Sequence, residues 1–123
     1  MEQLICIIED DEGIQDVLTI ILKSAGYETQ VYPSGKAIME NNYAIPDLFL
    51  IDKQLPDIDG LLICKHLKQE RLTSAIPIIM MSAFPNARQL SVESGADDFI
   101  EKPFQLENLI STIKKYISSE TVA

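Results

Sequence analysis

The sequence predicts a single α/β domain in which a five-stranded parallel sheet carries helices on both faces. Three observations support this fold class. Short apolar runs alternate with helical patterns along the chain, the length of 123 residues fits one compact domain, and no repeat, linker or low-complexity segment interrupts the alternation. Strictly alternating strands and helices imply a parallel sheet with right-handed crossovers.

The first half of the chain contains two strand–helix units. Residues 4–8 form a continuous apolar run rich in β-branched residues, which favours a strand that is buried on both faces. In residues 14–22 apolar side chains recur at helical spacing, and Gly26 follows where a helix stop is expected. Residues 28–32 are a short second strand, and a Pro-Ser-Gly turn opens a brief, weakly patterned helix over residues 33–42.

The second half contains three more units. Residues 48–51 are an apolar strand, and a turn rich in Pro, Asp and Gly separates it from a helix over residues 61–67. Residues 76–81 are the fourth strand, and a polar helix follows over residues 86–94. A short strand at residues 98–100 precedes the last helix. The apolar face of that helix is predicted to consist of Leu106, Leu109, Ile110, Ile113 and Ile117.

We assign residues 1–123 to one domain with a core from about 3 to 118 and a polar tail at 119–123, which is expected to fray. No apolar run approaches the roughly 20 residues of a membrane helix, and no secretory signal is visible. Cys6 and Cys64 lie in apolar segments without a C-x-x-C motif. We interpret them as small buried hydrophobic residues, which suits a reducing, cytoplasmic location.

The net charge of −9 argues against direct nucleic acid binding, because phosphates repel such a surface. An acidic balance suits a site for a divalent cation or a basic protein partner. Solubility alone also explains an acidic composition in many proteins.

Polar residues stand where the predicted strands end. Ligands of such sheets bind outside the carboxyl ends of the strands, so these residues are expected to meet at one edge. The strand ends carry three carboxylates, one hydroxyl and one ammonium, in the segments Glu9-Asp10, Asp52, Ser82-Ala83 and Lys102-Pro103.

Three close carboxylates repel one another, by roughly 4 kcal/mol for a pair about 4 Å apart at an effective dielectric constant near 20. A bound proton or cation relieves this repulsion. Oxygen ligands suit Mg²⁺, with Mn²⁺ as an alternative ion, and Mg²⁺ accepts phosphate as a further ligand. Asp52 could then act as a nucleophile toward phosphorus, with Lys102 and Ser82 holding phosphoryl oxygens.

These motifs together resemble, in order and spacing, the receiver domains of two-component response regulators, including the chemotaxis regulators. The resemblance spans nearly the whole chain and includes the segments Glu9-Asp10, Asp52, Leu55–Gly60, Met81–Ala83, Gly95–Phe99 and Lys102–Phe104. It implies a flavodoxin-like sheet with the strand order 2-1-3-4-5.

The resemblance implies that Asp52 accepts a phosphoryl group from a phosphohistidine on a histidine kinase or phosphotransfer protein. Asp10 would bind Mg²⁺ directly and Glu9 mostly through water, and the backbone carbonyl of Gln54 would complete the protein ligands. The domain would therefore be a phosphoacceptor switch that catalyses its own phosphorylation and dephosphorylation, and not a conventional enzyme.

The resemblance also implies a conformational switch. Lys102 would pair with Asp52 before phosphorylation and with the phosphoryl group afterwards, and Ser82 would move toward that group. Phe99, which stands where Tyr is frequent, would turn inward into the space that Ser82 vacates. The bond between Lys102 and Pro103 is expected to be cis.

Further residues flank the expected site: Lys53, Gln54, Ala83, Phe84 and Pro103. Lys53 stands where an apolar residue is common, and strand alternation points its side chain away from that of Asp52. We expect a solvated lysine there. Gln54 and Phe84 flank the phosphoryl group in the family and influence its lifetime, and bulky Phe84 is expected to restrict water and lengthen that lifetime.

Each residue also has a plain structural interpretation. Asp52 could be a turn residue and Ser82 a helix cap, and Glu9 and Asp10 could be a solvated strand end or helix-capping acids. Phe99 could be an ordinary core aromatic. Lys102 could be an ordinary surface lysine, and His66 is expected to be a surface or partly packed residue.

Two alternative functions remain at this point. One is a pseudo-receiver that only binds a partner. The other is a Mg²⁺-dependent phosphohydrolase with an aspartyl-phosphate intermediate, but the Asp-x-Asp motif that haloacid-dehalogenase phosphatases need after the first strand is absent. By resemblance, residues 86–117 form the output surface, with a phosphorylation-dependent dimer as one outcome, and the strand-end face near the first helix docks the kinase.

Overall fold

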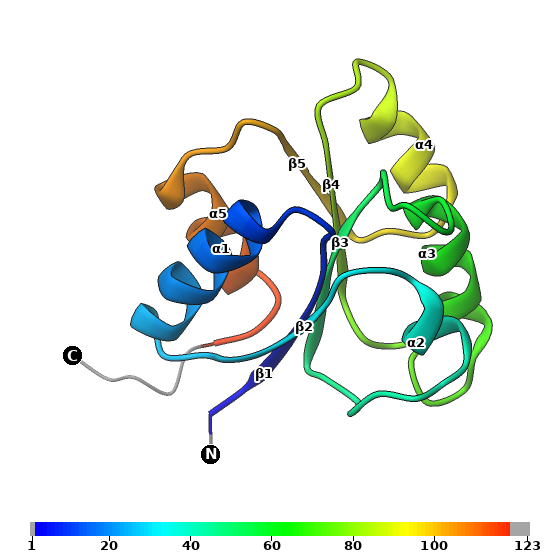
Figure 1. Cartoon of the computed structure of the whole chain (residues 1–123), viewed down its shortest axis with the longest axis horizontal. Coiled ribbons are helices and arrows are strands. Elements are labelled where there is room, and N and C mark those ends of the chain that lie inside the picture. Colours follow the sequence, from blue (N-terminus) through cyan, green and yellow to red (C-terminus); the bar gives the residue numbers. More distant parts are fainter. Residues whose placement is uncertain (1, 119–123) are drawn as a thin grey trace.

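The computed structural model describes residues 2–118 and confirms the predicted fold class (Figure 1). The five strands are β1 (Leu4–Ile8), β2 (Glu28–Tyr32), β3 (Leu48–Asp52), β4 (Ile78–Ser82) and β5 (Asp98–Glu101). The five helices are α1 (Glu12–Ser24), α2 (Lys36–Met39), α3 (Gly60–Gln69), α4 (Ala87–Glu93) and α5 (Leu106–Lys114). All neighbouring strands are parallel, in the expected order β2-β1-β3-β4-β5.

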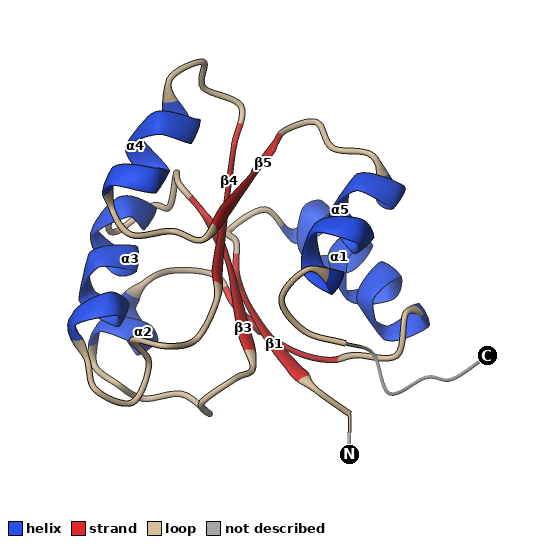
Figure 2. Ribbon diagram, turned by 180° about the vertical axis from the view of Figure 1, so that it is seen from behind, coloured by secondary structure: helices blue, strands red, loops and turns tan. Residues whose placement is uncertain are grey.

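The helices form one layer on each face of the sheet. Figure 1 and, from behind, Figure 2 show α1 and α5 together on one face, and α2, α3 and α4 on the other. Because every strand runs in the same direction, all carboxyl ends lie at one edge of the sheet. That edge is the uppermost one in Figure 1.

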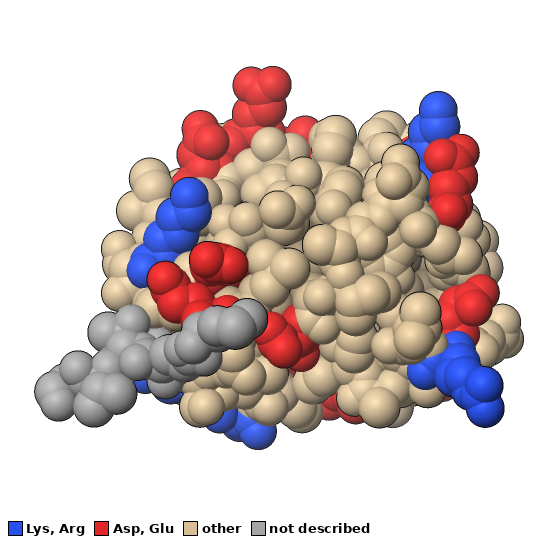
Figure 3. Space-filling model, turned by 90° about the horizontal axis from the view of Figure 1, so that it is seen from below, with Lys and Arg blue, Asp and Glu red and all other residues tan. Residues whose placement is uncertain are grey.

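The opposite side, at the amino ends of the strands, is shown in Figure 3. Lysine, arginine, aspartate and glutamate side chains lie mainly toward its rim there, and uncharged atoms occupy much of its centre. Among residues 2–118, no helix combines the length and apolar character needed to cross a membrane.

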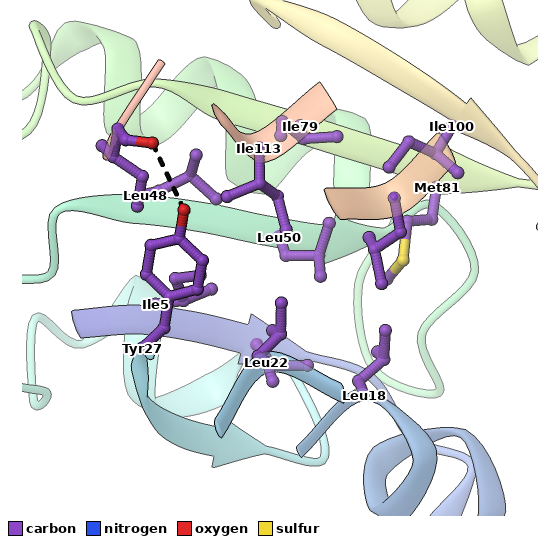
Figure 4. Close-up of a cluster of buried hydrophobic side chains, with 13 residues drawn as sticks. Ile5, Leu18, Leu22, Tyr27, Leu48, Leu50, Ile79, Met81, Ile100 and Ile113 are labelled. Atoms are coloured by element: carbon purple, nitrogen blue, oxygen red, sulfur yellow. Dashed lines mark hydrogen bonds between the residues drawn. The ribbon is translucent and has the colours of Figure 1, made fainter. Parts of the chain in front are cut away.

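Each face of the sheet buries its own apolar cluster, because successive strand side chains point to opposite faces. Ile5 and Ile7 pack toward α1 and α5, whereas Cys6 and Ile8 pack toward α2, α3 and α4. Figure 4 shows the first cluster, in which the Tyr27 hydroxyl donates a hydrogen bond to the carbonyl of Ile117 at 3.3 Å. The second cluster contains both cysteines, which are free and buried as expected.

Local signals set the helix ends. The Asp11 carboxylate accepts a hydrogen bond from the backbone N–H of Ile14 at 2.9 Å, so Asp11 caps α1 at its amino end. After α1 the chain reverses at Gly26, whose φ of +96° is the left-handed conformation that glycine adopts without strain. The Asp59 carboxylate caps α3 in the same way by accepting from Leu61 at 2.8 Å.

Some expected details were wrong. The second helix ends at Met39 instead of about residue 42, with Asn41 in a left-handed conformation (φ 57°) just beyond it. Ile117, expected on the apolar face of the last helix, lies beyond the end of α5 at Lys114, and Leu106 at the start of that helix is 53% exposed. Periodicity gives the direction of a side chain, but it does not show whether anything packs over the end of a helix. The expected frayed tail at 119–123 lies outside the described residues.

Candidate functional site

The sheet register brings the polar strand ends together. Ile8 pairs with Ile51, so the residues that follow β1 lie beside Asp52 at the end of β3. Asp52 pairs in turn with Met81, next to Ser82. These positions follow from parallel pairing, which the alternating sequence pattern predicted.

Three carboxylates form the centre of the site. Glu9 and Asp52 are only 1% and 5% exposed, whereas Asp10 faces solvent. One carboxylate oxygen from each of these residues lies within 4.8 Å of the others. Three carboxylate oxygens this close together could hold a small divalent cation, because Mg²⁺ prefers oxygen ligands.

Lys102 provides the positive charge of the site. Its backbone N–H donates to the Ser82 carbonyl at 2.9 Å, which fixes the residue beside β4. Its ammonium lies 3.3 Å from Asp52 Oδ2 and 2.6 Å from Glu9 Oε1. The resemblance implied pairing with Asp52 only, and sequence reasoning missed the closer partner, Glu9. Because its side chain is 16% exposed, a plain surface lysine is the wrong interpretation of Lys102.

Burial and charge shift the pKa values of this pair. Burial raises the pKa of Glu9, and the neighbouring Asp52 charge adds to that effect, although the hydrogen bond from Lys102 opposes it. Burial by itself lowers the pKa of Lys102, but its hydrogen bond to Glu9 and the charge of Asp52 outweigh burial and leave that pKa above its ordinary value. The lysine is therefore firmly protonated at neutral pH.

Glu9 is also the most firmly anchored of the three acids. Its second carboxylate oxygen accepts the backbone N–H of Asp11 at 3.2 Å, and its carbonyl accepts from the Gln15 amide at 2.6 Å. A simple solvated strand end is therefore the wrong interpretation for Glu9. It remains a good description of the exposed Asp10 when no cation is bound.

Ser82 and Phe99, the two residues expected to move on phosphorylation, are both buried. Ser82 is fully buried, and its hydroxyl accepts a hydrogen bond from the backbone N–H of Phe84 at 3.1 Å. Phe99 is 6% exposed, and the Arg88 guanidinium carbon lies 5.0 Å from the centroid of its ring. The structure thus gives Phe99 a core environment with a cation over one face, and its role as a switch stays a prediction.

Lys53 differs from the expectation of a solvated side chain. Only 14% of its side chain is exposed, and its ammonium pairs with Asp59 at 3.0 Å. The same ammonium lies 5.9 Å from the centroid of the Phe84 ring. The expectation of a solvated side chain was wrong because the loop that carries Asp59 folds back over the strand end and covers Lys53.

Gly60 contributes to the site in a way that the sequence analysis missed. A β-carbon at this position would lie 2.3 Å from the Asp52 carbonyl oxygen and 2.9 Å from the Lys53 α-carbon. Glycine therefore lets the start of α3 pack directly on the backbone of the expected phosphoacceptor. The available signal was a glycine eight positions after Asp52 and just behind a capping aspartate.

The remaining flanking residues surround this centre. The backbone N–H of Gln54 donates to Asp52 Oδ1 at 3.3 Å. Ala83 and Pro103 are exposed at the rim. The peptide bond between Lys102 and Pro103 is cis, which confirms that expectation.

Asp57 and Asp59 have Asp-x-Asp spacing but follow the third strand instead of the first. Asp57 accepts the backbone N–H of Gly35 at 3.0 Å, and Asp59 caps α3 and pairs with Lys53. Both carboxylates thus hold loops in place. His66 is partly packed, with its ring 3.3 Å from the Asn41 side-chain oxygen, and it lies on α3 away from the acidic centre.

Comparisons with known proteins agree with this arrangement. A response regulator receiver domain profile matches residues 5–114. The chain is 35% identical over 115 residues to the DNA-binding transcriptional regulator RpaA of Synechocystis, covering 89% of this chain and 47% of RpaA. It is 36% identical over 119 residues to the phosphate regulon regulator PhoB of Escherichia coli, covering 93% and 51%. The chain therefore spans about half the length of the curated relatives that it matches.

Solved structures show the same fold. A putative response regulator from Chloroflexus aurantiacus superposes with a TM-score of 0.89 at 32% identity, covering 94% of this chain and 98% of that one. The receiver domain of a sensor histidine kinase from Pseudomonas aeruginosa, with a magnesium ion coordinated in its active-site cleft, gives a TM-score of 0.85 at 24% identity. The superposition covers 94% of this chain and 98% of that one. At this identity the similarity is evidence for the fold only. Together with the acidic edge of its sheet, these matches show that the chain belongs to the response regulator receiver domains of two-component systems.

Proposed function

We propose that Asp52 is the phosphoacceptor of this domain and that a phosphohistidine on a histidine kinase or phosphotransfer protein is the donor. The observation that carries this proposal is the buried Asp52 carboxylate, which lies close to two other carboxylates and 3.3 Å from the Lys102 ammonium. A carboxylate oxygen of Asp52 would form the new bond to phosphorus while the bond to the histidine nitrogen breaks. Lys102 would then neutralise a phosphoryl oxygen.

The acidic oxygens fit Mg²⁺, with Asp10 and Asp52 as direct ligands, Glu9 mostly through water and the Gln54 carbonyl as a further protein ligand. When bound, the ion would neutralise charge on the transferring phosphoryl group. Before phosphorylation, the hydrogen bond from Lys102 to Glu9 keeps the Lys102 ammonium at the site. Mn²⁺ has the same preference for oxygen and would be an alternative ion.

Phosphorylation would shift the domain between two packings. The Ser82 hydroxyl would leave the backbone N–H of Phe84 and bind a phosphoryl oxygen, and Phe99 would adjust to the space that is left. Because Phe99 lies against Arg88 on α4, its movement would reach the surface at residues 86–117. We propose this surface for the output or a phosphorylation-dependent dimer, with no direct contact to nucleic acid by this domain.

The kinase-docking surface is proposed at the strand-end face near α1. A mostly apolar groove of about 680 Å³ borders the site there, and its lining includes Ile14, Val17, Lys102 and Phe104. Val17 is 50% exposed and Ile20 on the same helix 66%. Such an apolar surface beside the phosphoacceptor suits a partner helix. The two free, buried cysteines agree with a reducing compartment such as the cytoplasm.

The experiment that tests the phosphoacceptor is intact mass after incubation with acetyl phosphate and Mg²⁺. The wild type should gain one phosphoryl group, and the gain should disappear in Asp52→Asn and on addition of EDTA. Asp16→Asn is a matched control, because Asp16 is an exposed aspartate on α1. A gain that survives Asp52→Asn would contradict the proposal. No gain from either acetyl phosphate or a kinase would favour the pseudo-receiver.

Docking is tested by comparing two donors. Val17→Asp should slow transfer from a phosphorylated histidine kinase and leave transfer from acetyl phosphate unchanged. Val92→Asp on α4, which replaces a valine that is 62% exposed, is the matched control. Equal slowing by both variants would refute the α1 surface.

A further inference from the structure

Lys53 connects the two loops that flank Asp52. It directly follows Asp52, and its ammonium pairs at 3.0 Å with Asp59 in the loop between β3 and α3. The same ammonium lies 5.9 Å from the centroid of the Phe84 ring, which belongs to the loop between β4 and α4. One largely buried cation thus contacts both loops beside the phosphoacceptor.

The Asp59 end of this connection is firmly held. Asp59 uses its other carboxylate oxygen to accept the backbone N–H of Leu61 at 2.8 Å. The backbone N–H of Gly60 donates to the Lys53 carbonyl at 2.7 Å. The first turn of α3 therefore holds two groups in place: the Asp59 carboxylate and the backbone of Lys53, whose ammonium that carboxylate binds.

The Phe84 end is held much less. Phe84 is 49% exposed, and its backbone N–H donates to the Ser82 hydroxyl. We proposed above that this hydroxyl moves away from Phe84 on phosphorylation. The attraction between an ammonium and the negative face of an aromatic ring favours the ring position seen here. Lys53 is the only cationic group near this ring among the described residues.

We propose that Lys53, anchored by Asp59, is a positioning residue that holds the Phe84 ring at the sheet edge where β3 ends in Asp52 beside β4, and thereby slows hydrolysis of the phosphoryl group. This inference rests on the proposed phosphoacceptor role of Asp52. In hydrolysis a water oxygen forms a bond to phosphorus as the bond to the Asp52 oxygen breaks, which releases phosphate and restores the carboxylate. A ring held at the rim limits the approach of that water, and a released ring does not.

The test measures loss of the phosphoryl group by intact mass after acetyl phosphate is removed. Lys53→Met, which keeps the length but not the charge, should speed this loss about two- to fivefold, the range expected for an exposed cation–π contact. Phe84→Ala should speed it as much or more, and the double variant should match Phe84→Ala alone. Lys53→Arg should restore the slow rate, and Lys65→Met is the control for the lost charge because Lys65 is exposed on α3.

A normal rate in Lys53→Met, or an undiminished effect of Lys53→Met in the Phe84→Ala background, would overturn the inference. A second measurement does not need phosphorylation: the ring resonances of isotopically labelled Phe84 should move in Lys53→Met and stay in place in Lys65→Met. Unmoved resonances would also overturn it. If Asp52 accepts no phosphate at all, the phosphoacceptor proposal fails, and the ring resonances still decide whether Lys53 holds Phe84.

Discussion

The two edges of the sheet each contain a partly buried lysine, but they differ in charge balance. At the amino edge, Lys68 donates to Asp97 Oδ2 at 2.9 Å and to the Ile76 carbonyl at 3.0 Å. The same Asp97 oxygen accepts the backbone N–H of Ile78 at 2.8 Å. One ammonium thus matches one carboxylate, and the group ties α3 to the starts of β4 and β5.

At the carboxyl edge, Lys102 faces the carboxylates of Glu9, Asp10 and Asp52, so one positive charge meets three negative ones. Two of these acids are almost fully buried. A balanced ion pair with satisfied backbone partners stabilises a fold, whereas a buried excess of negative charge is relieved only by binding a proton or a cation. The comparison therefore separates a structural connection from a functional site within one sheet.

The largest effect should come from Gly60→Ala at the carboxyl edge. The added methyl group would meet the Asp52 carbonyl and the Lys53 backbone, neither of which is a flexible side-chain end. We expect a loss of about 3 kcal/mol in the free energy of unfolding, even though alanine favours helices over glycine by ~1 kcal/mol. Urea unfolding measures this, and an unchanged midpoint would show that α3 does not determine the position of Asp52.

The next largest effects are expected from Asp10→Asn, which should weaken Mg²⁺ binding but stabilise the metal-free domain. Removing one of three like charges should weaken Mg²⁺ binding roughly tenfold to a hundredfold, and it should raise the stability of the metal-free domain by up to about 1 kcal/mol. Calorimetric Mg²⁺ titration and thermal unfolding in EDTA measure the two quantities. If the variant lost stability without metal, the carboxyl edge would not carry a repulsive excess of charge.

Lys68→Met at the amino edge should only destabilise. It keeps an apolar side chain but leaves Asp97 and the Ile76 carbonyl without the ammonium, at a cost of about 1–2 kcal/mol. Mg²⁺ affinity and phosphorylation by acetyl phosphate should stay as in the wild type. A change in either one would mean that the amino edge is coupled to the site, and the distinction between the edges would break down.

The smallest effect is a dependence of Mg²⁺ binding on pH. Because the pKa of Glu9 is raised by burial, the folded metal-free domain holds this proton more tightly than the unfolded chain does. That stabilisation is fully present below the ordinary pKa of about 4.5 and is lost as pH rises through the raised value. The proton and Mg²⁺ compete, so Mg²⁺ affinity should rise over the same window in a calorimetric titration series. An affinity that stays flat from neutral pH down to 4.5 would contradict it.

The sequence by itself determined the fold class, the order of the elements and the positions of the main site residues. Continuous apolar runs identify strands that are buried on both faces, and parallel strands end together, so Asp52, Ser82 and Lys102 had to meet at one edge. This reasoning needs only alternation and direction, and both are encoded locally. The same local signals gave the glycine that follows α1.

Only the tertiary structure decided which charged groups form pairs and which side chains, expected to face solvent, are covered by loops. Glu9 was expected as a metal ligand, yet it is also the closest partner of Lys102, 93 positions away in the sequence. Lys53 looked solvated by alternation, but Asp59 and Phe84 cover it from two separate loops. Such contacts depend on the path that each loop takes over the strand ends. Ion pairs and cation–π contacts require distances of a few ångströms, and these distances cannot be obtained from the order of the residues alone.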